Sequence, residues 1–509
     1  MSRFLLRALL RGLLILLVLC VLLLTMLAGL LGSEAGNRWL LQQAERLEPR
    51  LQLEFEGGRL WQGWAFSRIL WHDQTLRVEV EQAQLNWSPG CLGGRRLCID
   101  LLAAERVQIF TEPDDSEDEP RRDIDLPDIR LPLGIHLHEA RLGRLELNGA
   151  PAMLQDVQLQ AQASGDNLHI TRFSGQGMDM AWQLDGDVRM SGDWPLLILA
   201  DIQLPPIDGR PWALQTRLGG SAANLELESR SSGYLDGQLT AQVQPLRAEL
   251  PLQARWRGRA FLATQSLPET LTLHDLELDL EGDLDQGIGV AARSRLEGEG
   301  GDVDLQLSGQ LTTSEFSGVE LQLNVADEPA RLLHLNGRFG WEDQLSADAE
   351  LQMLQFPWQW LYPQSLGDLQ VNQLNAQAHL RGERIESNLQ AGLSGAGGQT
   401  ADLSLSLSGT ARQLDINPLT LTTSGGSLTG AATVGMEEAI TWQADLHLDG
   451  LNPQLFVSQL PGSLSGPVTS TGRLHNGQLE LDADWNIGGT LRRQPLSLQG
   501  AVGAESAAG

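Results

Sequence analysis

The chain of 509 residues has no lysine, two tyrosines, three cysteines and nine histidines. Its 36 basic residues are all arginine and stand against 65 acidic ones, so the net charge is 36 − 65 = −29. A surface this acidic repels polyphosphate and excludes general nucleic-acid binding. The few cysteines and histidines leave little material for a metal site, and we expect neither a metal nor a cofactor.

Sequence motifs of the common catalytic classes are also missing. We find no nucleophile elbow, Walker loop, dinucleotide fingerprint or HExxH pair. The sharpest acidic run, Asp114–Glu119, lacks the glycine and the twelve-residue spacing of a calcium loop, and we interpret it as a solvated segment. His136 and His138 are too isolated to predict a metal site. The expectation is therefore a protein that is not an enzyme.

The N-terminus holds the one long apolar run. Residues 12–31 carry no charge, and three arginines precede them. That length spans a bilayer as a helix, and the arginines place residues 1–11 in the cytoplasm and the rest of the chain outside. A cleaved signal peptide is the alternative, but its apolar region is shorter and needs a better cleavage site. We expect an uncleaved inner-membrane anchor, then a short helix capped by Ser33 within residues 32–50.

From Leu51 onward the apolar period changes to two. Strict alternation predicts strands with one apolar and one polar face, and Gly, Asp and Asn between the runs predict short turns and antiparallel pairing. We divide this part into an entry β segment (51–110), an acidic, proline-containing loop (111–130) and a repetitive β region (131–509). The clearest alternating residues are Leu276, Leu278, Leu280, Val303, Leu305, Leu307, Leu321, Leu323, Val325, Leu403, Leu405 and Leu407.

An internal repeat follows from two similar segments. Phe356–Pro363 and Leu451–Phe456 begin 451 − 356 = 95 residues apart, and each follows an alternating run. Pro205-Pro206 and Pro211-Trp212 predict an older, weaker copy. Repeated β units indicate an elongated structure in which each strand contacts mainly its neighbours. The apolar faces could pair as a sandwich, close as a barrel or curl into an open trough, and periodicity does not distinguish these.

Cys91 and Cys98 flank a turn between two predicted strands. An oxidising compartment outside the inner membrane favours a disulfide between them, and the short loop makes it a modest stabiliser. Two free thiols, one in each strand, are the alternative.

Several segments resemble one family, in the order anchor, entry segment, Leu/Gly repeats. They are Gly36–Gln42, Gly58–Leu60, Leu85–Pro89, Leu101–Ile109, Leu407–Ala411 and Gly425–Gly430. Together they resemble the N-terminal part of the TamB family, within the wider AsmA-like group. The resemblance implies an all-β, β-taco-like trough with an apolar interior, anchored in the inner membrane and reaching through the periplasm. It also implies phospholipid acyl chains as cargo and a TamA-type outer-membrane barrel as partner.

One departure from that family concerns length. Its members are much longer and end in a domain that reaches the outer-membrane barrel, so we expect this chain to be a fragment, a truncated product or one piece of a split protein. Docking to the barrel then depends on a part that this sequence lacks.

Three functions compete at this level. A lipid conduit requires an open apolar groove, for which the twelve alternating residues above are the candidates. A scaffold for outer-membrane protein assembly requires an exposed strand edge. A stalk or adhesin requires a sealed core. The direction in which the alternating leucines and valines point distinguishes them.

Overall fold

A computed structural model describes residues 29, 32–73, 75–111, 122–362, 369–395, 398–437, 439–475 and 478–505. Helix α2 (Glu34–Leu47) begins at the predicted cap, where the Gly36 amide donates to the Ser33 hydroxyl at 3.1 Å. The predicted anchor, residues 12–31, lies outside the described residues apart from Gly29. Within the described ranges, no helix combines the length and the apolar character that a bilayer crossing requires.

The chain divides into two units, Met1–Leu250 and Pro251–Gly509. The predicted repetitive β region, 131–509, extends over both units. The N-terminal unit contains β1 (Leu51–Arg59), β2 (Gly63–His72), β3 (Leu76–Ser88), the 3₁₀ turn η1 (Pro89–Gly94), β4 (Arg96–Thr111), β5 (Leu131–Leu147), β6 (Leu154–Gly165), β7 (Asn167–Gly177), β8 (Met180–Arg189), β9 (Leu196–Ile207), β10 (Arg210–Ser221), β11 (Asn224–Gly233) and β12 (Gly237–Val243).

The C-terminal unit is built the same way, with short helical turns between some strands. It contains β13 (Leu252–Phe261), η2 (Glu269–Leu271), β14 (Leu273–Asp283), β15 (Gly287–Gly298), β16 (Gly301–Leu311), β17 (Glu315–Val325), β18 (Glu328–Gly340), β19 (Ser346–Leu354), α3 (Trp358–Leu361), β20 (Gln370–Arg381), β21 (Arg384–Ser394), β22 (Thr400–Thr410), β23 (Gln413–Thr423), β24 (Gly426–Met436), β25 (Ile440–Leu451), η4 (Pro453–Leu455), β26 (Gly462–His475), β27 (Gln478–Leu491) and β28 (Gln494–Glu505).

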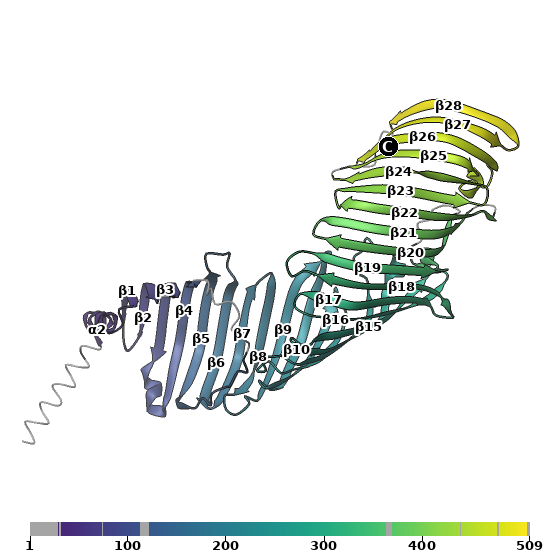
Figure 1. Cartoon of the computed structure of the whole chain (residues 1–509). Helices are drawn as coiled ribbons and strands as arrows, with labels where there is room; N and C mark the ends of the chain where they lie inside the picture. Colours follow the sequence, from purple (N-terminus) through teal and green to yellow (C-terminus); the bar gives the residue numbers. More distant parts are fainter. Residues whose placement is uncertain are drawn as a thin grey trace, which may run out of the picture. The chain divides into compact units, whose positions relative to one another are not determined.

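Within each unit, every strand pairs with the strand that follows it in the chain (Figure 1). The same order holds from β13 through β28. Each unit is therefore one curled layer of strands, and its strands end at two opposite margins where the turns lie. The all-β, curled-sheet prediction is confirmed.

One pair departs from the antiparallel prediction, because β4 and β5 run parallel. A parallel pair needs a long crossover, and residues 112–130 separate the two strands; the described part of this connection, 122–130, contains no helix. The described end of this connection runs along one margin of the sheet. There Ile124 donates its amide to Leu246 at 2.8 Å, and Ile129 donates to Met190 at 2.8 Å. This segment ties the turns of β8–β9 and β12 together.

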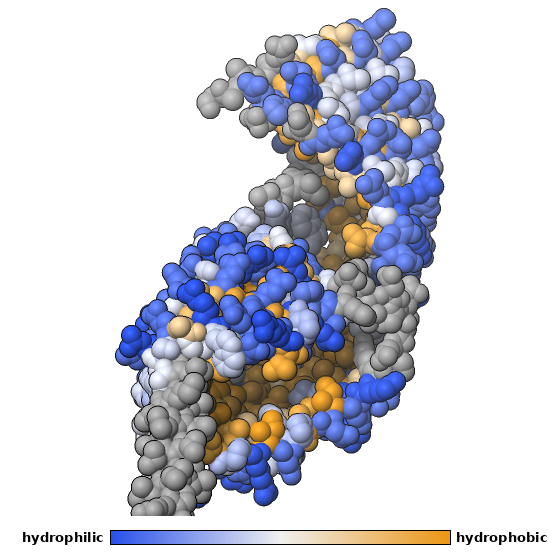
Figure 2. Space-filling view, turned by 90° about the vertical axis from the view of Figure 1, so that its left-hand side faces the viewer, coloured by the Kyte–Doolittle hydropathy of each residue, from blue (hydrophilic) through white to orange (hydrophobic). Residues whose placement is uncertain are grey.

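The two faces of each sheet differ in polarity, as alternation requires. In β9 the partly buried residues alternate with exposed ones, and Leu196, Ile198 and Ile202 belong to the partly buried face. Figure 2 looks into the N-terminal unit in its lower part and shows a hollow lined by hydrophobic residues, with hydrophilic residues over the outside. We call the apolar side of each sheet its inner face.

The 95-residue repeat has a structural basis in the C-terminal unit. Phe261, Phe356 and Leu451 stand 95 residues apart, and each begins a longer connection at the same margin, between β13 and β14, β19 and β20, or β25 and β26. We call this the long-loop margin and the opposite one the hairpin margin. The predicted weaker copy at Pro205 and Pro211 is wrong, because these prolines lie within β9 and β10. The third copy begins at Phe261 instead.

Candidate functional site

Strands β16 and β17 bring six of the twelve predicted groove residues directly opposite one another. All six lie on the inner face, because residues two apart in a strand point the same way. Directly opposed side chains in a sheet lie close enough to contact each other. The facing pairs are Val303–Val325, Leu305–Leu323 and Leu307–Leu321.

The other six predicted residues extend this surface on β14 and β22. On β14, Leu278 faces Trp256 of β13 and Ala292 of β15, while Leu276 and Leu280 flank it. On β22, Leu403 faces Leu421 and Leu405 faces Leu419, while Leu407 faces Ile416. The twelve residues therefore belong to one inner face, in two groups separated by strands β18 to β21.

The intervening strands keep the inner face apolar. Leu321 and Leu323 continue onto Leu335 and Leu333 of β18, which face Leu351 and Met353 of β19. On β20 and β21, Ala376 faces Leu389 and Leu374 faces Ala391. The apolar surface is thus continuous from β14 to β23.

The long-loop margin closes over part of this surface. A first buried cluster forms where the α3 segment folds onto the inner face, and it contains Leu296, Val303, Met353, Phe356 and Leu361. Val303 has 0% of its side chain exposed. The segment is fixed by Thr270, whose hydroxyl donates to the Leu361 carbonyl at 2.6 Å.

Trp360 of the same segment packs on a turn that only glycine allows. A Cβ atom at Gly300 would lie 2.2 Å from the Trp360 ring, and one at Gly298 would lie 2.9 Å from its Cβ. Trp360 also contacts strand β18, where the Arg331 guanidinium lies 5.0 Å from the centre of the indole ring. The turn between β15 and β16 is therefore shaped to receive this indole.

A second buried cluster repeats this arrangement further along the unit. Here η4 folds back and buries Leu455 completely, with 0% of its side chain exposed. Its partners in the cluster come from four strands, β21, β22, β23 and β25. The cluster contains Ala391, Leu393, Ala401, Leu421, Leu448, Leu451 and Leu455.

The outer face of the C-terminal unit is covered by charged cross-strand pairs. Glu277 lies within ion-pair distance of Arg257 and of Arg293. Asp348 accepts hydrogen bonds from His379 at 2.7 Å and from Arg381 at 3.0 Å, and the His379 bond is the main cause that lowers the pKa of Asp348. These pairs mark the outer face as the solvent-facing side.

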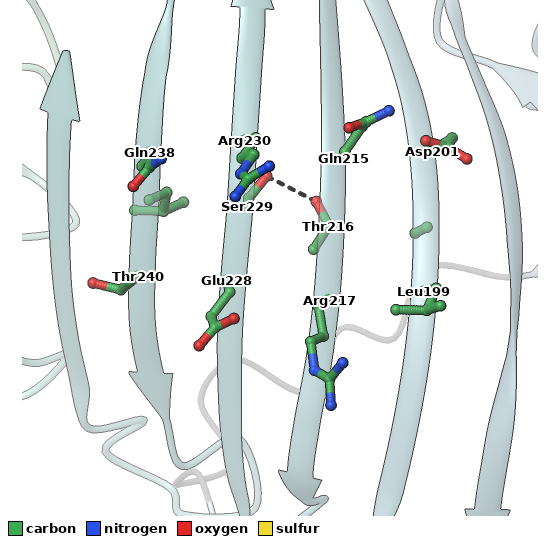
Figure 3. A pocket seen from close by; sticks show the side chains of 12 residues that line it. Leu199, Asp201, Gln215, Thr216, Arg217, Glu228, Ser229, Arg230, Gln238 and Thr240 are labelled. Carbon is green, nitrogen blue, oxygen red and sulfur yellow. Dashed lines mark hydrogen bonds between the residues drawn. The ribbon is translucent and has the colours of Figure 1, made fainter. Parts of the chain in front are cut away.

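Hydroxyl groups interrupt the inner face of the N-terminal unit, which sequence reasoning missed. Thr216 of β10 and Ser229 of β11 lie opposite each other with their hydroxyl oxygens 2.9 Å apart (Figure 3). The Trp212 indole donates to Ser231 at 2.8 Å, and Ser231 donates to the Leu235 carbonyl. We call Trp212, Thr216, Ser229 and Ser231 the hydroxyl patch. The side chains of the hydroxyl patch therefore find hydrogen-bond partners within the patch or at the Leu235 carbonyl.

A shallow pocket of about 570 Å³ spans β9 to β12, and its charged lining residues alternate with the hydroxyl patch, so they belong to the outer face of these strands. Figure 3 shows charged and amide side chains along it, among them Asp201, Arg217, Glu228 and Arg230. No histidine or cysteine is among its lining residues. The pocket therefore offers carboxylates and guanidinium groups but no nucleophile held by a base.

Two sequence observations concern β4 and β5. Cys91 and Cys98, the predicted pair, are joined by a disulfide with Cα atoms 5.9 Å apart.

His136 and His138 have ring centres 4.1 Å apart, and His138 lies 3.4 Å from Asp100. Burial lowers the pKa of His136, which favours its neutral form. Among the described residues, no group of three or more potential ligands is arranged to hold a metal ion.

Comparison with known proteins agrees with the resemblance in the sequence. The family described as "TamB, N-terminal domain" matches residues 23–148, 119–390 and 357–509. The "Translocation and assembly module subunit TamB" of Haemophilus influenzae (strain ATCC 51907 / DSM 11121 / KW20 / Rd) is 22% identical over 535 aligned positions, which cover 93% of this chain. The chain spans 38% of that relative's length. No solved structure matches. With matches that run from residue 23 to the end, the chain belongs to the family of TamB N-terminal domains.

Proposed function

We propose that this chain is part of a conduit that carries phospholipid acyl chains along the inner face of its sheets. The observation that carries the proposal is the continuous apolar surface from β14 to β23, backed by a charged outer face. A catalytic protein would need convergent acid and base groups, and the role proposed here is not enzymatic.

The energetic argument concerns the hydrocarbon. Exposing an acyl chain to water costs about 0.8 kcal/mol per CH₂, or roughly 12 kcal/mol for a chain of about 15 such groups. A surface such as the facing pair Leu307 and Leu321 lowers that cost at every strand it crosses. No side chain has to react, and the headgroup stays in water. Transfer along such a surface needs only that the apolar face remains unbroken.

The cellular setting is part of the same proposal. The uncharged residues 12–31 anchor the chain in the inner membrane, and the sheets extend into the periplasm. The relative from Haemophilus influenzae is named as a subunit of a translocation and assembly module, which supports a role in such a module. We extend this to a TamA-type outer-membrane barrel as partner.

Lipid analysis of the purified full chain tests the proposal. The protein is extracted with its surrounding lipid, exchanged into lipid-free detergent, and analysed by mass spectrometry for retained phospholipid. We expect retained phospholipid in the unaltered protein and at least fivefold less when Leu321, on the inner face, is changed to Asp. Gln322→Asp, one residue away on the outer face, is the matched control and should retain lipid as the unaltered protein does.

Equal lipid retention by the two variants, or none in the unaltered protein, would contradict the conduit. A scaffold for outer-membrane protein assembly, the competing function, predicts no dependence of lipid retention on the inner face. It predicts instead that client binding depends on strand edges.

A further inference from the structure

Helix α2 lies along the outer edge of strand β1 (Figure 1). On one side β1 pairs with β2. On its other side, the Leu53 amide donates to the Glu45 carboxylate at 2.7 Å, and the Leu51 amide donates to the Glu48 carbonyl at 3.0 Å. The helix and the residue that follows it therefore supply acceptors to backbone groups at the edge of the sheet.

The chain enters α2 directly from the uncharged run 12–31. A Cβ atom at Gly32, the residue after this run, would lie 3.6 Å from the Trp61 Nε1 atom. Trp61 lies in the turn between β1 and β2 and is 45% exposed. Close by, the buried Asn37 accepts from the Trp64 indole at 3.1 Å, which fixes the first turns of α2 to β2. A bilayer crossed by residues 12–31 would thus reach this corner of the sheet, at the level where indole rings are favoured.

The outward side of α2 has the composition of an interfacial helix. Ala35, Trp39, Gln42 and Arg46 follow at spacings of four, three and four residues and are all exposed, so they form one stripe. Trp39 is 51% exposed, and the exposed Arg38 borders the stripe. An indole ring suits the boundary between headgroups and acyl chains, and guanidinium groups bind phosphate. We call these four residues the outward stripe.

A strand edge needs a cover where it meets lipid. Free backbone N–H groups find no acceptor in hydrocarbon, and in water an open edge pairs with other chains. At β1 the cover is α2, whose own backbone groups are paired within the helix. Because Leu53 is bonded to Glu45 on the sheet side of α2, the outward stripe points away from the sheet.

From this arrangement we infer that the outward stripe and Trp61 bind the headgroup layer of the bilayer, with α2 parallel to the membrane plane and between the β1 edge and the lipid. The partner is the periplasmic surface of the inner membrane. The inference rests on the anchor in the proposed function and adds a second membrane contact, which orients the N-terminal unit.

The parallel orientation follows from two lengths. Ala35 and Gln42 are seven residues apart, which is about 10 Å along a helix axis. The headgroup layer on one side of a bilayer is about 5–8 Å thick. Both residues can lie within it only if α2 is close to the membrane plane.

Nitroxide labels on the full chain test this orientation. Labels are placed at Ala35→Cys, Gln42→Cys or Gln203→Cys in vesicles of phosphatidylethanolamine and phosphatidylglycerol. A background with Cys20→Ala leaves each label single, because the other two cysteines form a disulfide. Collision of the label with oxygen is then compared with collision with a water-soluble nickel chelate. We expect equal oxygen-to-nickel ratios at 35 and 42, at least threefold above the ratio at Gln203, which is exposed on β9.

A further label at Leu22, within the proposed anchor, separates the inference from the proposed function. A high ratio at position 22 with low ratios at 35 and 42 overturns the inference and leaves the anchor intact. A high ratio at 35 with a low one at 42 places α2 along the membrane normal and also overturns the inference. Low ratios at all three positions overturn the anchor and the inference together.

A second arm tests the indole of the stripe. Trp39→Glu should lower the ratio at position 42 at least twofold, because a carboxylate is poorly accommodated at the acyl boundary. Trp341→Glu, at a tryptophan of the C-terminal unit that is 42% exposed, is the matched control and should leave the ratio unchanged. An unchanged ratio in Trp39→Glu would overturn the assignment of the stripe as the binding surface.

A third arm tests the cover over β1. Glu45→Ala removes the acceptor of the Leu53 amide, and we expect hydrogen exchange of residues 51–59 to become at least fivefold faster. Glu45→Gln keeps an acceptor oxygen and should stay within twofold of the unaltered protein. Exchange in Glu45→Ala as slow as in the unaltered protein would overturn the role of α2 as a cover.

Discussion

The two units solve the same packing problem differently. A single curled sheet has nothing to bury its inner face against unless the chain supplies a cover. In the C-terminal unit the long connections supply it, and Val303 and Leu455 are fully buried. In the N-terminal unit fewer apolar residues are buried. Its buried residues include three serines, Ser221, Ser229 and Ser231. Within the described residues, the two large hydrophobic clusters both lie in the C-terminal unit.

The comparison teaches that one strand pattern can give either an open groove or a local core. Val303 and Leu307 of β16 are indistinguishable by period, yet Val303 is buried and Leu307 is partly exposed, because a connection more than 50 residues away packs on Val303. The strands therefore determine which residues lie on the inner face, and the connections determine which of those residues are buried.

The largest effect is expected from a substitution that interrupts the apolar inner face of the C-terminal unit. Leu321→Asp places a carboxylate in the middle of β17, between Leu307 and Leu335, where it meets a passing acyl chain without a partner. We expect lipid transfer between donor and acceptor vesicles to fall at least tenfold. Gln322→Asp should leave transfer within twofold of the unaltered protein, and a similar loss in both variants would remove the inner face from the mechanism.

The next effect separates the covered margin from the open one. Leu455→Ala removes a fully buried side chain and should lower the local free energy of opening by about 2–5 kcal/mol. Leu474→Ala, at the exposed margin, should lower it by about 0.5 kcal/mol or less. Hydrogen exchange of the full chain over residues 389–451 measures the first, and over residues 440–475 the second. Equal losses would contradict the assignment of a core to one margin.

A smaller effect concerns the N-terminal unit, where paired charges take a structural role. Glu79 is buried and forms ion pairs with Arg68 and Arg77, and the hydrogen bond from Arg68 is the main cause that holds the pKa of Glu79 below its ordinary value of 4.5. Glu79→Gln should lower local stability by about 1–3 kcal/mol at pH 7.

The sign of the pH dependence follows from the lowered pKa. The ionised Glu79 stabilises the fold above pH 4.5, and that contribution is lost as the pH falls through the lower folded-state pKa. The difference in hydrogen exchange between Glu79→Gln and the unaltered protein should therefore shrink below pH 4.5. A difference that stays constant down to pH 3 would rule out the ion pairs as its source.

The smallest expected effect is at the hydroxyl patch. Because Thr216 and Ser229 satisfy each other, replacing both with Val and Ala removes donors and acceptors together. We expect lipid transfer within about 1.5-fold and stability within about 0.5 kcal/mol of the unaltered protein. The single change Ser229→Ala is the control, since it leaves Thr216 alone, and it should be the more destabilising of the two. A large loss of transfer in the double variant would assign the patch a role in handling lipid.

Much of the secondary structure can be predicted from residues that lie close together in the sequence. Alternation such as Leu321, Leu323 and Val325 predicts strand, face and register, because side-chain direction in a strand has a period of two. Ser33 predicts the start of α2 for an equally local reason. The two similar segments at Phe356 and Leu451 predict a repeat, although a copy as divergent as the one at Phe261 escapes comparison by residue type.

What pattern cannot predict is contact between distant segments. The parallel pairing of β4 and β5 has no sign in the alternation of either strand, and the described residues 122–130 contact β8 and β12 segments far along the chain. The burial of Val303 depends on Phe356 and Leu361, more than 50 residues away. The hydroxyl patch combines Thr216 with Ser229 through register, and single polar residues within an alternating run carry no sign of such a partner.

Site-specific capture of lipid tests the central claim most directly. A benzophenone amino acid is placed at Leu321 on the inner face or at Gln322 on the outer face of the full chain, irradiated in living cells, and the purified protein is analysed by mass spectrometry. The account predicts a phospholipid adduct at position 321 and at most one tenth as much at position 322. Equal capture at the two positions, or none at position 321, would contradict it.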